Sequence, residues 1–219
     1  MTSRPKHAEP RPQPRLYLMT PRVAEAASLR EPLAQALAAG DVAAVLLRFA
    51  NTDERAQINS AKALVEVTQA KDVALLLDGH AELVARAGCD GAHLAGIEAL
   101  KEAIGTLKPD RIAGAGGLAT RHDAMTAAEA GTDYVMFGEP DEHGERLAFA
   151  TVEERVGWWA ELFELPCVAY AGSFDEIDPL VKAGADFIAL GDWIWRDPTT
   201  VASIVADVAQ RLRLPEPTA

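Results

Sequence analysis

The sequence predicts an α/β protein built as a single (β/α)8 TIM barrel, and three observations carry that prediction. Eight short apolar runs alternate with helix-like segments through the central part of the chain. The runs are continuously apolar, which is typical of parallel strands that helices cover. Four Ala-Gly turns, each ending in Asp, close a predicted helix and open the next strand. A doubly wound open sheet is the alternative, although such a sheet more often uses five or six strands.

The predicted elements follow one another with short connections. Strands are expected at residues 16–20, 42–48, 73–77, 91–95, 111–117, 134–138, 167–172 and 187–191. Apolar residues three and four positions apart predict the helices between them, as at residues 51–70. Glycine in the four turns is expected to take the left-handed conformation of a helix C-cap; the turns are Ala39-Gly40-Asp41 and residues 87–90, 130–133 and 183–186.

The barrel is expected to occupy residues 15–212. Residues 1–14 contain four prolines and predict a disordered N-terminal arm, and residues 213–219 predict a flexible tail. The basic N-terminal stretch is not followed by the apolar run of a signal peptide.

Composition excludes some classes of partner. The 219 residues include 21 Lys and Arg against 33 Asp and Glu, a net charge of −12. This acidity argues against nucleic-acid and membrane partners, because both present negative charge. Two cysteines cannot form a disulfide framework, and no apolar run is long enough to span a membrane, so a cytoplasmic protein is expected. The sequence leaves a homo-oligomer open.

Chemistry in such a barrel is expected at the carboxyl ends of the strands. Arg48 ends the second strand and requires an anionic partner, which is either a protein carboxylate or a ligand phosphate. Asp78 and Glu98 follow the next two strands and could bind Mg²⁺ together. The alternative is that Asp78 caps a helix and Glu98 is solvated. His93 ends an apolar strand, where a hydrogen-bonded packing role is the alternative to catalysis.

Glycines at the ends of the last two strands predict a phosphate site. Backbone N–H groups of Gly172 and Gly191 can approach phosphate oxygens because no side chain intervenes. Ser173 and Asp192 follow them directly and are expected at the same site. A small phosphorylated ligand is compatible with the overall acidity, because one local site overrides the global field.

Five segments in register resemble the thiamine-phosphate synthase / TenI family, over nearly the whole core from Leu16 to Trp195. LYLMT resembles the family's Leu-Tyr-Leu-Val-Thr-Asp strand, and CDGAHLAG is similar to Gly-Ala-Asp-Gly-Val-His-Leu-Gly. AGTDYVMFGEP is similar to Gly-Ala-Asp-Tyr-Val-Gly-Phe-Gly-Pro. CVAYAGS and AGADFIAL resemble the last two strands, which carry Ala-Ile-Gly-Gly-Ile and Ala-Gly-Ala-x-Gly-Val-Ala-Val.

The resemblance implies a Mg²⁺-dependent synthase that joins two small phosphorylated heterocycles in thiamine biosynthesis. A pyrimidine pyrophosphate ionises, the thiazole phosphate captures it, and pyrophosphate and thiamine phosphate result. On the family pattern Arg48 matches the arginine of Gln-Leu-Arg-x-Lys, Asp78 matches the Asp of Asn-Asp, and Glu98 replaces the second Mg²⁺-binding Asp. Gly172 and Gly191 fall where backbone amides hold the thiazole phosphate, and Gly116 or Gly117 replaces a site serine.

Several positions differ from the family pattern. Leu46, Ala50 and Leu77 replace Gln, Lys and Asn, and the Thr-rich loop that ends in lysine is here EPDEHGER. Arg146 is the nearest basic candidate in that loop, which carries four acids: Glu139, Asp141, Glu142 and Glu145. Two alternatives therefore stay open. One is a TenI-like thiazole phosphate isomerase, for which Glu139 and His143 are the acid–base candidates, and the other is a non-catalytic phosphate-binding barrel.

Overall fold

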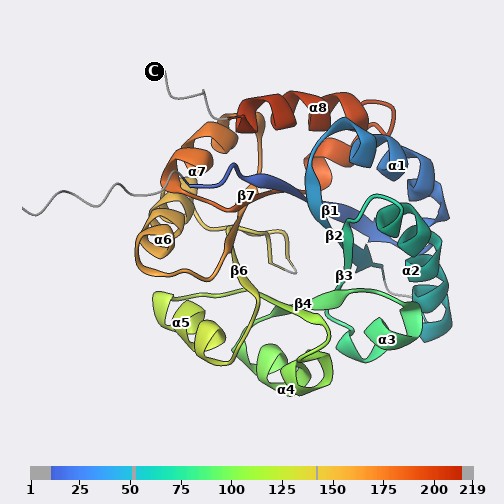
Figure 1. The fold of residues 1–219 in the computed structure, drawn as a ribbon, viewed down its shortest axis with the longest axis horizontal. Helices are drawn as coiled ribbons and strands as arrows, with labels where there is room; N and C mark the ends of the chain where they lie inside the picture. Colours follow the sequence, from blue (N-terminus) through green and yellow to red (C-terminus); the bar gives the residue numbers. More distant parts are fainter. Residues whose placement is uncertain (1–10, 51–52, 142, 214–219) are drawn as a thin grey trace, which may run out of the picture.

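The computed structural model describes residues 11–50, 53–141 and 143–213, and these form a closed eight-stranded barrel. Each strand pairs in parallel with the next along the chain, and β8 pairs with β1 to close the ring. Figure 1 looks down the barrel, with the helices forming an outer ring around the strands. The predicted (β/α)8 barrel is confirmed.

The strands lie where the apolar runs predict them. They are β1 (Arg15–Val23), β2 (Val42–Phe49), β3 (Ala74–Asp78), β4 (Gly91–Ala95), β5 (Ile112–Gly116), β6 (Tyr134–Phe137), β7 (Cys167–Ala171) and β8 (Phe187–Leu190). Only β1 differs by more than two residues, since it runs beyond Thr20 to Val23. An irregularity in its pairing with β2 lies between Met19 and Arg22 and accommodates Pro21, which has no N–H to donate.

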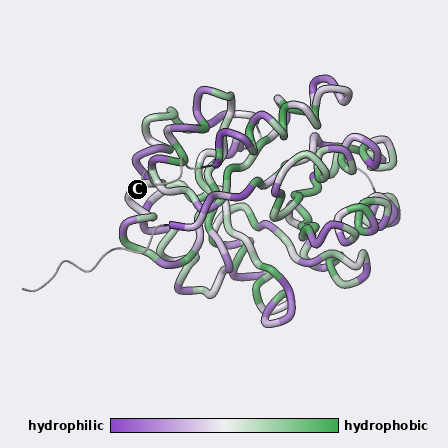
Figure 2. Tube along the Cα trace, turned by 45° about the horizontal axis from the view of Figure 1, so that its top comes forward, coloured by the Kyte–Doolittle hydropathy of each residue, from purple (hydrophilic) through white to green (hydrophobic). Residues whose placement is uncertain are grey.

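A helix follows every strand. The helices are α1 (Arg30–Ala39), α2 (Glu54–Gln69), α3 (Val84–Ala87), α4 (Ile97–Leu107), α5 (Arg121–Glu129), α6 (Phe149–Leu162), α7 (Ile177–Ala183) and α8 (Val201–Leu212). Short 3-10 turns precede four of them, at Ala26–Leu29, Ala81–Leu83, Phe174–Glu176 and Asp192–Trp195. Hydrophilic and hydrophobic segments alternate along the helices in Figure 2, the pattern of helices that cover a core with one face. No helix of the described chain is long and apolar enough to cross a membrane.

The strands separate two apolar layers because successive side chains point to opposite faces. Leu16 and Leu18 of β1 pack outward in the large core between strands and helices. Tyr17 and Met19 point inward, into a smaller cluster at the barrel centre. That inner cluster also receives residues from other strands: Ala44, Leu46, Leu76, Tyr134, Met136, Val168, Tyr170 and Ala189.

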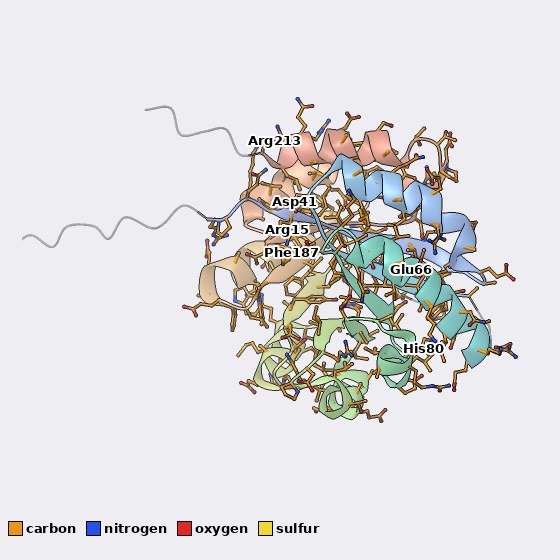
Figure 3. All side chains as sticks on the ribbon, turned by 45° about the vertical axis from the view of Figure 1, so that its right-hand side comes forward. Arg15, Asp41, Glu66, His80, Phe187 and Arg213 are labelled. Atoms are coloured by element: carbon orange, nitrogen blue, oxygen red, sulfur yellow. The ribbon has the colours of Figure 1, made fainter. Side chains whose placement is uncertain are left out.

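The repeated turns tie the amino-terminal end of the barrel together. The carboxylates of Asp90, Asp133 and Asp186 each accept a backbone N–H at the start of the preceding strand, all at 2.8 Å. The donors are Leu75, Ala113 and Cys167. The fourth aspartate, Asp41, instead accepts from the guanidinium of Arg15 at 3.0 Å, and the two lie side by side in Figure 3.

The expected left-handed glycine is found in three of the four turns. Gly88, Gly131 and Gly184 have φ between 76° and 99°. The expectation is wrong for Gly40, whose φ is −155°. That turn is one residue shorter, and a Cβ on Gly40 would lie 3.0–3.1 Å from Val205, Ala209 and Leu16. Close packing of α8 therefore explains the glycine there.

The predicted terminal segments fall mostly outside the described residues, which exclude 1–10 and 214–219. Within the predicted arm, residues 11–14 are described and irregular. The Arg11 guanidinium donates hydrogen bonds to the carbonyls of Gly184 and Ala160, at 3.3 and 2.5 Å.

Candidate active site

A cavity of about 450 Å³ opens at the carboxyl ends of β1 to β6. Its wall combines basic, acidic and imidazole side chains with glycine backbone. The lining residues are Met19, Arg22, Arg48, Asp78, His93, Ala95, Gly96, Gly117, Glu139, Pro140 and Asp141. Chemistry-bearing residues from five strands therefore meet where the sequence predicts the site.

Arg48 is the buried cation of this cavity, with 7% of the residue exposed. Its Nε donates to the carbonyl of Thr20 at 2.6 Å, and its guanidinium forms an ion pair with Asp192. The sequence left either a protein carboxylate or a ligand phosphate as the partner of Arg48. In the structure the partner is the carboxylate of Asp192. The side chain of Asp192 is 64% exposed, so it can give way to a ligand anion at little desolvation cost. Arg22 pairs with Arg48 in the β1–β2 register and adds a second guanidinium.

Asp78 ends β3 and faces the same cavity, 3.7 Å from the guanidinium of Arg22. It does not cap the following turn, whose N-cap is His80 and has no side-chain hydrogen bond. Glu98 lies outside the cavity lining. Its side chain is 88% exposed and pairs with Lys101 at 3.7 Å. The structure therefore brings Asp78, but not Glu98, into the candidate site.

A hydrogen-bonded chain crosses the barrel interior to His93. The Nδ1 atom of His93 lies 3.0 Å from the hydroxyl of Tyr134. That hydroxyl lies 2.8 Å from the hydroxyl of Tyr17. Burial lowers the pKa of His93 to about 4 and raises the pKa of both tyrosines. All three groups are therefore uncharged near neutral pH. His93 is hydrogen-bonded, as the packing alternative expects, yet it also lines the cavity.

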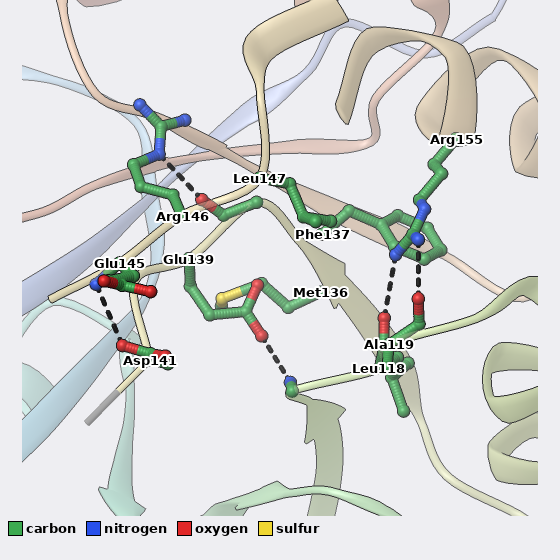
Figure 4. A pocket seen from close by; sticks show the side chains of 12 residues that line it. Leu118, Ala119, Met136, Phe137, Glu139, Asp141, Glu145, Arg146, Leu147 and Arg155 are labelled. Atoms are coloured by element: carbon green, nitrogen blue, oxygen red, sulfur yellow. Dashed lines mark hydrogen bonds between the residues drawn. The ribbon is translucent and has the colours of Figure 1, made fainter. Parts of the chain in front are cut away.

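Glu139 follows β6 and lines the cavity as a partly buried carboxyl group. Its Oε1 accepts the backbone N–H of Gly117 at 2.6 Å, as Figure 4 shows. Burial raises its pKa to about 7, against the opposing effect of this hydrogen bond, and the charge of Asp78 adds to the rise. Glu139 also lines a neighbouring cavity of about 360 Å³, so it stands in the wall that the two cavities share.

A protein carboxylate occupies the predicted phosphate position at Gly172. Glu176 accepts the Gly172 N–H at 2.7 Å and receives both ends of the Arg146 guanidinium at 3.1 and 3.0 Å. Arg146 is fixed independently, since its Nε donates to the Gly138 carbonyl at 3.0 Å (Figure 4) and its guanidinium lies 5.0 Å from the Tyr170 ring centre. The Gly172 N–H and the Arg146 guanidinium therefore both bind the carboxylate of Glu176.

The other predicted residues lie at the β7 and β8 ends. Ser173 is exposed and precedes the Phe174–Glu176 turn. Gly191 is buried, and a Cβ there would collide with the Tyr170 hydroxyl. Nearby, Trp195 donates to the Met19 carbonyl at 2.8 Å and packs in the core between strands and helices. The acid–base candidate His143 is exposed on the loop after β6 and lines neither cavity, and Glu142 lies outside the described residues.

Sequence reasoning missed two site residues. Arg22 was missed because Pro21 marked the end of the first predicted strand, although a basic residue directly after that strand was a usable signal. Glu176 was missed because its carboxylate reaches back to Gly172 through a 3-10 turn. No local pattern in the sequence distinguishes it from Asp175, its exposed neighbour.

Fold and site together define a (β/α)8 barrel whose carboxyl face has a cavity lined by two arginines, a histidine and three carboxylates. A family model described as "Thiamine monophosphate synthase" matches residues 16–194. The chain belongs to this family. It is 40% identical over 202 residues to a protein named thiamine-phosphate synthase from Rhodospirillum centenum, covering 91% of this chain and 98% of that protein. It is also 37% identical over 207 residues to a protein named thiamine-phosphate synthase from Hyphomonas neptunium. The match covers 90% of this chain and 93% of that protein.

A solved structure supports the fold separately. The thiamine phosphate pyrophosphorylase from Pyrococcus furiosus superposes with a TM-score of 0.73 at 20% identity. The superposition covers 92% of this chain and 98% of that chain.

Proposed function

We propose that this chain makes thiamine phosphate by joining a pyrimidine pyrophosphate to a thiazole phosphate, with release of pyrophosphate. The carrying observation is the cavity where Arg22 and Arg48 stand beside Asp78 at the strand ends. Membership of the thiamine monophosphate synthase family, and relatives named thiamine-phosphate synthase, support the same reaction. Both substrates are small phosphorylated heterocycles.

The two arginines are assigned to the pyrophosphate. Arg48 is held by Thr20 through Nε, so its terminal nitrogens are already oriented when an anion replaces Asp192. A guanidinium offers paired donors that match phosphate oxygens and keeps its charge at any working pH. Developing negative charge on the leaving group is stabilised by such preoriented donors.

Mg²⁺ is part of the proposal. Among the described residues, no group of three or more His, Cys, Asp and Glu is arranged to hold a metal ion. Mg²⁺ commonly uses only one or two carboxylates and takes its other ligands from water and substrate phosphates. Asp78, an oxygen donor in the cavity beside the arginines, fits that coordination. The ion would neutralise pyrophosphate charge, with Asp78 holding it.

The reaction is tested with purified protein and both substrates. We expect thiamine phosphate and pyrophosphate to form in equal amounts, and turnover to vanish when EDTA removes Mg²⁺. Isomerisation of the thiazole phosphate without pyrophosphate release would instead support the TenI-like alternative. Tight binding of the thiazole phosphate with neither reaction would support a non-catalytic barrel.

Asp78→Asn is expected to raise the Mg²⁺ concentration needed for half-maximal turnover by about tenfold or more, because a neutral amide replaces the carboxylate ligand. Glu102→Gln, an exposed change on α4, is the matched control and should leave it unchanged. The structure also predicts a small effect for Glu98→Gln, since this carboxylate lies outside the cavity. A tenfold effect of Glu98→Gln would restore it as the second Mg²⁺ ligand.

A further inference from the structure

Glu139 is a carboxyl group of the cavity that the proposed roles leave unused. Its Oε1 is fixed by the Gly117 N–H at 2.6 Å. Gly116 leaves room for it, because a Cβ there would collide with both Glu139 Oε1 and His93 Nε2. These two atoms therefore approach the same space above the end of β5. The carboxyl group is held in place at the cavity wall rather than free in solvent.

The ring of strands sets Glu139 opposite the anion-binding arginines. In a closed ring of eight strands, β6 lies across the barrel from β2, so Glu139 and Arg48 come from opposite walls. His93 lies between them on β4 and is uncharged near neutral pH, so it does not offset the carboxylate. The cavity thus carries Arg22, Arg48 and Asp78 on the wall of β1 to β3, and Glu139 on the facing wall.

Other charged and titratable groups surround Glu139. Asp78 on β3 raises its pKa, and Arg146 on its own loop opposes that rise. The remaining groups that line the cavity or extend its hydrogen-bonded chain are Arg22, Asp141, Tyr134 and Tyr17.

We propose, building on the synthase function above, that Glu139 is a catalytic carboxylate that stabilises the cation formed on the pyrimidine. The carbon–oxygen bond to pyrophosphate breaks, and its electron pair leaves on the pyrophosphate oxygen toward Arg22 and Arg48. The positive carbon remains beside Glu139 until the lone pair of the thiazole nitrogen forms the new carbon–nitrogen bond. The positive charge then resides on the thiazolium ring, no proton moves, and Glu139 is unchanged.

This role requires the ionised carboxylate. With a pKa raised to about 7, Glu139 is neutral below that pH and ionised above it. A charge facing a cation in a desolvated site acts far more strongly than in water. Turnover should therefore rise with pH through the region around 7.

The first test is the pH profile of kcat. We expect Glu139→Gln to lower kcat about tenfold at pH 8 and to abolish the rise around pH 7, because an amide does not titrate. Glu145→Gln makes the same charge change in the same loop outside the 450 Å³ cavity and should keep the wild-type profile. A Glu139→Gln enzyme with wild-type kcat and an unchanged rise would overturn the assignment.

The second test does not depend on turnover. Aminomethylpyrimidine, an ammonium ion near neutral pH, mimics the cation, and hydroxymethylpyrimidine is its neutral counterpart. With inorganic pyrophosphate and Mg²⁺ present, calorimetry at pH 8 should show Glu139→Gln weakening the ammonium ligand about tenfold and the neutral ligand much less. Equal losses for both ligands, or none, would reject the role of Glu139. A wild-type protein without turnover contradicts only the synthase proposal, and this binding comparison still decides on Glu139.

Protein stability provides the folding control. A carboxyl whose pKa rises on folding contributes stability at low pH and loses it as pH rises through its folded pKa. Glu139 therefore destabilises the fold above pH 7 relative to pH 5. Glu139→Gln should melt at a higher temperature than wild type at pH 8 and close to wild type at pH 5. A Glu139→Gln protein that melts at a lower temperature than wild type at both pH 8 and pH 5 is destabilised by a change in packing, not by the loss of the charge.

Discussion

Replacing Arg48 with methionine is expected to lower kcat/KM for the pyrimidine pyrophosphate by roughly 100- to 1,000-fold. The guanidinium is buried and already oriented by Thr20, and Arg22 alone does not replace its paired donors in the cavity. Arg48→Lys should recover only part of the loss, since an ammonium group lacks the paired donors of the fork. Steady-state kinetics with saturating thiazole phosphate measures the effect.

Two controls separate binding from folding in this test. Arg30→Met removes a half-exposed arginine from α1 and should leave kcat/KM unchanged. Asp192→Asn removes the carboxylate that competes with the substrate for Arg48, and should keep or improve pyrophosphate affinity. Arg48→Met with wild-type kcat/KM and an unchanged melting temperature would show that the pyrophosphate binds elsewhere.

Replacing Gly172 with aspartate is expected to weaken thiazole phosphate binding by at least about 100-fold. A Cβ at this position would collide with Arg146, and the new carboxylate would add negative charge at the expected phosphate position. Calorimetric titration with the thiazole phosphate measures the loss, and circular dichroism checks the fold. Unchanged affinity in a folded Gly172→Asp protein would remove the phosphate site from β7.

Glu176→Gln gives the opposite result at the same site. Glu176 occupies the Gly172 N–H and the Arg146 fork, so an incoming phosphate must displace a charged competitor. The amide keeps the shape and removes the charge, and thiazole phosphate affinity should rise about tenfold. Asp175→Asn, an exposed change one residue away, should have little effect. A loss of affinity in Glu176→Gln would mean that Glu176 positions Arg146 for the ligand.

The fold was predictable from the sequence because its signals are local. A continuous apolar run such as residues 42–48 has to be buried on both sides, and only covered parallel strands do this repeatedly. The repeated Ala-Gly turns added the order of helix and strand. The wrong prediction of a left-handed Gly40 has a different origin. Its close packing against α8 is a long-range contact, which the residues of a short turn do not predict.

The site was predictable only as far as strand ends position side chains. Arg48 and Asp78 end buried strands, so the barrel itself places them in the cavity. Glu98 is on the first turn of α4, where helix rotation turns its carboxylate toward solvent and Lys101. Glu139 and Glu176 depend on loop conformation, and their partners, the Gly117 and Gly172 amides, come from other segments. Contacts with backbone amides cannot be predicted from residue type, because every residue except proline has the same N–H group.

The hydrogen bonds accepted by Asp90, Asp133 and Asp186 have a consequence for which loops of this barrel can be replaced. They fasten the starts of β3, β5 and β7, at the opposite end of the barrel from the substrate cavity. Whole loops at the carboxyl end can therefore be exchanged, lengthened or recharged while these hydrogen bonds at the amino-terminal end stay in place. Directed evolution toward another phosphorylated heterocycle can randomise residues 140–145, keep Glu139 and Arg146, and spare the turns that carry these aspartates.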